Sequence, residues 1–145
     1  MTTPKSTRVV QAYVFFGGKC EEALEFYRKA LGAETLMLMR YKESPEPPAP
    51  GMIPPGFEEK VMHASFRIGE TTVMGSDGCC AGEQAHNGFC LSLTVGTEEE
   101  AKEIFAALSE GGEVGMPLAK TFFSPQFGMV TDRFGINWMV LMPAD

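Results

Sequence analysis

The sequence predicts an α+β domain built from two tandem βαβββ units. A helical segment at 21–31 recurs at 99–108, and each copy follows a strand candidate across a short turn that contains glycine. Further strand candidates follow both helices. Because the same order of elements occurs twice, we expect the two units to fold alike. Unit one then covers about 9–76 and unit two about 89–142.

Length and composition favour a single domain over 1–145. The chain has 145 residues, and 44% of them are hydrophobic, which is enough for a sizeable core. The net charge of −7 opposes binding to nucleic acid or to an anionic membrane surface. No apolar run is long enough to span a bilayer. We therefore expect a cytoplasmic protein without nucleic-acid or membrane partners.

In unit one, the first strand is expected over Val9–Phe16. The following helix has an apolar stripe made of Cys20, Leu24, Tyr27 and Leu31. Gly32 suits the left-handed position that ends a helix. Three more strands are expected, at Thr35–Tyr41, Val61–Ile68 and Thr71–Met74. Gly69 and Glu70 form the tight turn of the last hairpin.

A proline-rich segment at 43–59 interrupts unit one. Its prolines are Pro45, Pro47, Pro48, Pro50, Pro54 and Pro55. Such a segment excludes a helix or a central strand and predicts a long loop. The loop is either a lid over a binding site or a tolerated insertion.

In unit two, the first strand is expected over Phe89–Val95. Thr97 and Glu100 have the spacing of a capping box at the start of the helix. The helical stripe consists of Ala101, Ile104, Phe105 and Leu108, and Gly111 or Gly112 ends the helix. The strands that follow are expected at Val114–Leu118, Phe127–Thr131 and Ile136–Leu141, with the hairpin turn at Phe134-Gly135.

Several motifs, in this order, carry a resemblance to a known family. They are Glu22-Ala23-Leu24-Glu25-Phe26-Tyr27 with Leu31-Gly32, then Val61-Met62-His63-Ala64, Arg67-Ile68-Gly69, Met74-Gly75-Ser76-Asp77, and Gly128 to Trp138. The chain resembles the vicinal-oxygen-chelate superfamily (glyoxalase/bleomycin resistance/dioxygenase), in its PhnB-like branch. The resemblance implies that each unit curls its strands into a half barrel with the helix outside. It also implies a ligand cleft between units and a homodimer that in some members exchanges units.

The enzymes of that superfamily bind a divalent metal at one position on the first strand and one on the last strand of each unit. In this chain those positions are occupied by Gln11 or Ala12, Val73 or Met74, Cys90, and Met139. Hard and borderline cations prefer carboxylate and imidazole ligands, so we predict no metal and no other cofactor. A zinc site formed by Gln11, His63 and Cys90 is the disfavoured alternative.

Strand alternation predicts what would line the cleft instead. Cys90, Ser92 and Thr94 share one face of their strand, and the opposite face, which we expect under the helix, carries Phe89, Leu91, Leu93 and Val95. The predicted ligand-binding residues are Gln11, Tyr13, Met74, Cys90, Ser92 and Met139. Phe123 and Trp138 are available as aromatic lining, although Trp138 fits an ordinary core position better.

The function predicted from these features is the binding of a small organic molecule in the cleft between units. The alternative is a metal-dependent lyase, isomerase or dioxygenase of the same superfamily. Whether the protein is an enzyme stays open, and His63 and Cys90 are the candidate catalytic residues. The adjacent Cys79 and Cys80 are read as loop thiols rather than a redox pair.

Overall fold

The computed structural model describes residues 8–46, 51, 53–78 and 85–144. Unit one consists of β1 (Tyr13–Phe15), α1 (Cys20–Leu31), β2 (Glu34–Arg40), β3 (Val61–Ile68) and β4 (Thr71–Ser76). Unit two consists of β5 (Leu91–Thr94), α2 (Glu98–Ser109), β6 (Glu113–Ala119), β7 (Phe127–Thr131) and β8 (Asn137–Leu141). The described residues therefore contain two βαβββ units, as the sequence predicts.

The two sheets have the same topology. Their strand orders are β1-β4-β3-β2 and β5-β8-β7-β6, and in each the first strand pairs with the last strand in parallel while the other pairs are antiparallel. Even the register corresponds. The row Tyr13–Met74–Ser65–Met37 in the first sheet matches the row Ser92–Met139–Met129–Met116 in the second. This correspondence confirms the α+β fold with two related mixed sheets.

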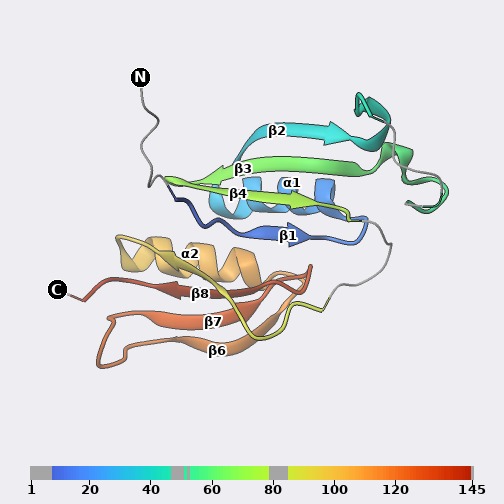
Figure 1. Cartoon of the computed structure of the whole chain (residues 1–145). Helices are drawn as coiled ribbons and strands as arrows, with labels where there is room; N and C mark the ends of the chain where they lie inside the picture. Colours follow the sequence, from blue (N-terminus) through green and yellow to red (C-terminus); the bar gives the residue numbers. More distant parts are fainter. Residues whose placement is uncertain (1–7, 47–50, 52, 79–84, 145) are drawn as a thin grey trace, which may run out of the picture.

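Both helices lie behind the sheets in the view of Figure 1, and α2 lies on the same side of its sheet as α1 does. Strands β2 and β6 lie at the outer ends of the molecule, while β1, β4, β5 and β8 lie toward its middle (Figure 1). Each sheet thus has a helix-covered face and an open face. The open faces face the viewer in Figure 1.

One apolar core joins the two units behind the sheets. Strand alternation explains its composition, because Val14 and Phe16 of the first strand region are buried whereas Tyr13 and Phe15 are exposed. The expected stripes of both helices contribute to the core, with Leu31 and Ile104 only partly buried. Tyr27 of α1 packs between the two units: its ring stacks on Phe66 at 5.9 Å and meets Trp138 edge-on at 5.6 Å.

The helix ends follow the sequence signals. Gly32 is left-handed at φ 68°, and its N–H donates to the Arg28 carbonyl. At α2 the Thr97 hydroxyl accepts from the Glu100 N–H at 3.1 Å. The Glu100 carboxylate accepts from the N–H of Gly96. This helix start is therefore capped by two side chains, as the Thr97–Glu100 spacing predicts.

Three predictions about local structure were wrong. Phe89 does not pack under the helix: its strand begins only at Leu91, and Phe89 is 49% exposed. Strand β1 is shorter than the predicted 9–16. The ends of the proline-rich segment are not pure loop, because short 3₁₀ turns form at Tyr41–Glu43 and Phe57–Glu59. Cys79 and Cys80 lie outside the described residues.

Candidate functional site

Four of the candidate residues lie on the open face of the first sheet. Gln11 precedes β1 and donates from its amide to the Thr72 carbonyl at 3.2 Å. Tyr13 pairs with Met74 across β1 and β4, and His63 lies on β3, two residues before Ser65, which also pairs with Met74. The structure therefore brings Gln11, Tyr13, His63 and Met74 together on one face.

This geometry also chooses between the alternatives that the sequence left open for the metal positions. Ala12 packs against the core and Val73 is buried on the helix side. Gln11 and Met74 are therefore the residues whose side chains belong to the open face.

The other three candidates belong to the second sheet. Ser92 pairs with Met139 across β5 and β8, and Cys90 immediately precedes β5 as a partly buried free thiol. Ser92 and Thr94 are exposed, and Leu91 and Leu93 pack against the core, which confirms the predicted orientation of this strand. The candidates thus form two groups, one on each sheet.

The two aromatic candidates, Trp138 and Phe123, lie in different surroundings. Trp138 is 3% exposed and belongs to the core, as expected, and its indole N–H is hydrogen-bonded. Phe123 follows β6, is partly exposed and contacts the ring of Phe127. Neither residue is placed on the open face by its strand position.

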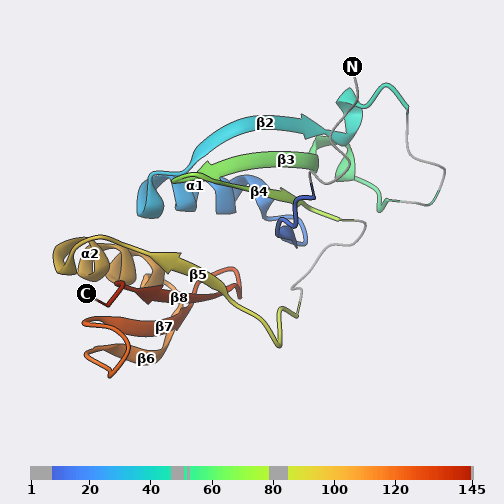
Figure 2. The same cartoon turned by 60° about the vertical axis from the view of Figure 1, so that its left-hand side comes forward.

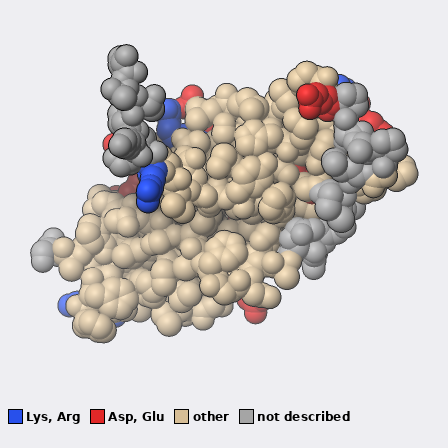
Figure 3. Space-filling model, in the orientation of Figure 1, with Lys and Arg blue, Asp and Glu red and all other residues tan. Residues whose placement is uncertain are grey.

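The open faces carry few charges. In Figure 3, which has the orientation of Figure 1, charged side chains lie mostly at the margins of the visible surface. Large apolar side chains are exposed there instead, among them Tyr13 (39%), Phe15 (48%), Met37 (41%) and Met116 (46%). An exposed apolar surface of this kind marks a binding or association surface.

Tyr13 and His63 are hydrogen-bonded to each other on this surface. The distance from Tyr13 Oη to His63 Nδ1 is 3.0 Å, and the rings are 5.5 Å apart. Partial burial raises the pKa of Tyr13, and hydrogen bonding by Ser76 opposes that rise. The phenol therefore stays protonated near neutral pH and remains a hydrogen-bond donor. Both residues are candidates from the sequence, but no sequence pattern indicates that they are in contact.

The residues at the superfamily's metal positions do not fit a divalent cation. Gln11, Met74, Cys90 and Met139 offer one amide, two thioethers and one thiol, a set without carboxylate or imidazole. Among the described residues, His, Cys, Asp and Glu side chains form no group of three or more that could hold a metal ion.

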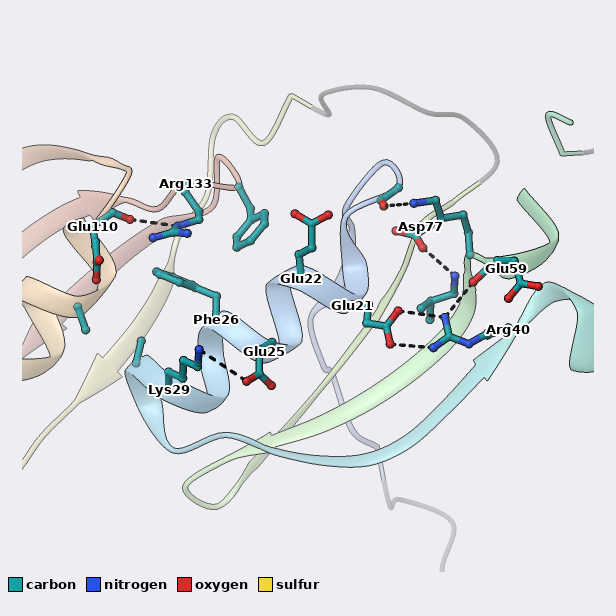
Figure 4. Close-up of a pocket in the computed structure, with 16 residues that line it drawn as sticks. Glu21, Glu22, Glu25, Phe26, Lys29, Arg40, Glu59, Asp77, Glu110 and Arg133 are labelled. Carbon is teal, nitrogen blue, oxygen red and sulfur yellow. Dashed lines mark hydrogen bonds and ion pairs between the residues drawn. The ribbon is translucent and has the colours of Figure 1, made fainter. Parts of the chain in front are cut away.

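A separate groove of about 1060 Å³ lies on the helix side, where α1, the end of α2 and the β7–β8 turn meet. Figure 4 shows that its walls are charged. Arg40 binds Glu21 with two hydrogen bonds, of 2.7 and 3.1 Å, which lowers the pKa of that carboxyl. Arg133 stacks over Phe26 at 4.6 Å. These pairings tie the elements together, and none of the predicted site residues lines the groove.

Two buried carboxylates organise the fold around these surfaces. Asp132 accepts from Tyr27 Oη at 2.6 Å and from Trp138 Nε1 at 2.8 Å, and Asp77 accepts from the N–H groups of Cys20 and Val61, each at 2.7 Å. From the sequence, both aspartates are known only as members of the motifs that carry the family resemblance. Their burial and partners depend on tertiary contacts, so no local pattern could identify their role.

The match to known families decides which family this fold represents. The family model described as 3-demethylubiquinone-9 3-methyltransferase matches residues 8–141. A solved structure from Bacillus cereus bears the name "Putative 3-demethylubiquinone-9 3-methyltransferase, PhnB protein" and is 30% identical to this chain. The match covers 93% of this chain and 99% of the Bacillus cereus chain, with a TM-score of 0.73. The chain belongs to the PhnB-like family.

Two further relatives agree with this assignment. Protein YjdN of Escherichia coli K12 is 34% identical over 133 residues, which cover 88% of the PhnB-like chain and 90% of YjdN. The structure of protein PA1353 from Pseudomonas aeruginosa is 36% identical, covers 94% of this chain and all of its own, and has a TM-score of 0.78.

A more distant neighbour shares this fold. The glyoxylase/bleomycin resistance protein/dioxygenase domain from Frankia is 14% identical and has a TM-score of 0.65 over 97% of this chain. This likeness concerns the fold alone, and it confirms the vicinal-oxygen-chelate architecture. None of the helices in the described part of the chain is both long and apolar enough to cross a membrane.

Proposed function

We propose that this PhnB-like protein is a cytoplasmic homodimer that binds a small, partly apolar organic molecule in a cleft formed by the open sheet faces. The observation that carries the proposal is the composition of those faces. Tyr13, Met74, Ser92 and Met139 occupy equivalent rows of the two sheets and combine aromatic, thioether and hydroxyl groups. Pockets for organic ligands are mostly apolar with a few placed polar groups, and these faces have that character.

The methyltransferase activity in the family's description is not part of this proposal. The sequence contains no glycine-rich motif that would hold the methyl donor. The residues on the open faces instead support recognition: Gln11 and His63 offer polar groups, and the methionines offer an adaptable apolar lining.

Thermal-shift screening tests the binding proposal. The screen contains metabolites, dicarbonyl adducts and cationic aromatic antibiotics, the last because the net charge of −7 attracts cations. A ligand that prefers the folded state stabilises it, by about 2.7 kcal/mol at a hundredfold excess over Kd. We expect at least one compound to raise Tm, and Tyr13→Ala and Met139→Ala to reduce the shift.

Glu22→Ala is the matched control for this screen, because Glu22 is exposed and lines the helix-side groove rather than the sheets. We expect this variant to keep the full shift. A screen without any stabilising compound, or a shift that Glu22→Ala abolishes while Tyr13→Ala keeps it, would contradict binding at the open faces.

If the homodimer forms through the open sheet faces, a charge placed on those faces should weaken it. Met37 and Met116 are exposed at equivalent positions of the two sheets. A carboxylate introduced into a closed apolar interface loses its hydration, so we expect Met37→Glu and Met116→Glu to weaken the dimer at least tenfold, a change of about 1.4 kcal/mol. Light scattering after size-exclusion chromatography measures this change.

Ala106→Glu serves as the control for the dimer, because it adds the same charge at an exposed position of α2. It should leave the dimer intact. A wild-type protein that elutes as a monomer at all concentrations would rule out the homodimer.

A further inference from the structure

The Tyr13–His63 contact reaches across an intervening strand. Tyr13 lies on β1 and His63 on β3, and β4 lies between them in the sheet order. The 3.0 Å hydrogen bond therefore holds the imidazole over the middle of the open face. The thioether of Met74, which pairs with Tyr13, belongs to the same face.

The hydrogen bond behind Tyr13 that involves the backbone has a defined direction. The N–H of Gly78 can only donate, and it donates to Ser76 Oγ at 2.8 Å. The Ser76 hydroxyl, 2% exposed, also lies next to the phenol of Tyr13 and lowers its pKa, and it can donate its own proton to the phenol oxygen. The Tyr13 proton is then directed to His63 Nδ1. A neutral imidazole that accepts at Nδ1 carries its proton on Nε2.

The surroundings indicate which ligand group suits this donor. The ring of Phe15 lies 5.1 Å from that of Tyr13, which supplies aromatic surface. Arg67, a cation on the same face of β3, is engaged with Glu34 at 2.6 Å. With its charge paired, and with a net protein charge of −7, this face does not favour an anion.

We propose that Tyr13 and Ser76 hold His63 as an Nε2–H donor that binds the carbonyl oxygen of a neutral, partly aromatic ligand. Tyr13 is then a positioning residue, and His63 is the residue that touches the ligand. The inference rests on the proposed function, since it names the chemistry of the molecule bound on the open faces.

The tautomer of His63 tests the relay without any ligand. Nitrogen-15 NMR above the ordinary pKa of imidazole distinguishes a protonated Nδ1 from a protonated Nε2, and His86 is the internal reference. We expect His63 to be protonated only at Nε2, and Tyr13→Phe to move its two nitrogen shifts toward those of His86. A proton on Nδ1, or shifts that Tyr13→Phe leaves unchanged, would overturn the relay.

A matched pair of probes tests the ligand chemistry. Acetophenone offers a carbonyl oxygen, and ethylbenzene has a similar shape without an acceptor. A single neutral hydrogen bond predicts about fivefold tighter binding of acetophenone in NMR titrations. We expect His63→Phe, which keeps an aromatic ring, to remove that preference.

The outcomes separate the two proposals. Equal binding of both probes to the wild type would overturn the carbonyl-donor role of His63 while leaving ligand binding at the open face in place. If the tautomer is as expected but neither probe nor any screened compound binds, the proposed function itself fails, and the ligand half of this inference fails with it.

Discussion

Replacing Asp132 with alanine is expected to lower the free energy of unfolding by roughly 3–4 kcal/mol. Asp132 is 3% exposed and accepts four hydrogen bonds. The donors are Tyr27 Oη, Trp138 Nε1 and the N–H groups of Phe134 and Ile136. Alanine leaves the phenol and indole donors buried without an acceptor, and each such group costs about 1–3 kcal/mol. Urea denaturation monitored by the fluorescence of the single tryptophan measures the loss.

Tyr27→Phe separates the inter-unit hydrogen bond from the rest of this network. It removes one donor of Asp132 and leaves the other three in place, so we expect a loss of about 1 kcal/mol. Because Tyr27 and Asp132 share one hydrogen bond, the double variant should lose less than the sum of the two single variants. Glu99→Ala, at an exposed carboxylate, should change stability little. A loss below about 1 kcal/mol in Asp132→Ala would show that the carboxylate does not hold the units together.

The repeat and its consequences could be predicted from the sequence because they depend on local periodicity. Alternation assigned Leu93 and Ser92 to opposite faces, and helical spacing placed Tyr27 and Leu108 in the core. The structure agrees on all four. These assignments depend on hydrophobic patterns that one element displays by itself.

What the sequence could not show depends on where strands end and on which distant residues meet. Phe89 continues the apolar alternation of its strand, yet pairing begins only at Leu91, so Phe89 stays exposed. Asp132 lies 105 positions from Tyr27, and Tyr13 lies 50 positions from His63, and no short-range pattern encodes either contact. The sequence therefore predicts on which strand faces the candidate residues lie, whereas the hydrogen bonds between them are seen only in the structure.

Alkaline pH is expected to destabilise the protein mainly through Cys20. This residue is fully buried at the first position of α1, and burial, followed by the charges of Asp77 and Glu21, raises the pKa of its thiol from 9.0 to about 12. Below pH 9 the thiol is protonated in both states and stability does not depend on it. Above pH 9 it ionises only in the unfolded chain, which then binds fewer protons than the native state.

The free energy of unfolding should therefore fall as pH rises, by about 1.4 kcal/mol from this residue at pH 10 and by about 4 kcal/mol near pH 12. Tyr13 and Tyr27, whose pKa values burial also raises above 10.0, begin to add to the fall near pH 10. Urea denaturation of the wild type and of Cys20→Ala between pH 8 and pH 10 gives the contribution of the thiol as the difference between the two slopes. In Cys20→Ala the slope should be flatter by that 1.4 kcal/mol, whatever the variant loses at pH 8.

Cys90→Ala is the matched control, because Cys90 is a partly exposed thiol on the other unit. The two variants differ in the environment of the thiol and not in its chemistry, so a difference between their slopes measures burial at the start of α1. Equal slopes for Cys20→Ala and the wild type would mean that the thiol ionises as readily in the native protein as in the unfolded chain, which is incompatible with a closed core beneath this helix.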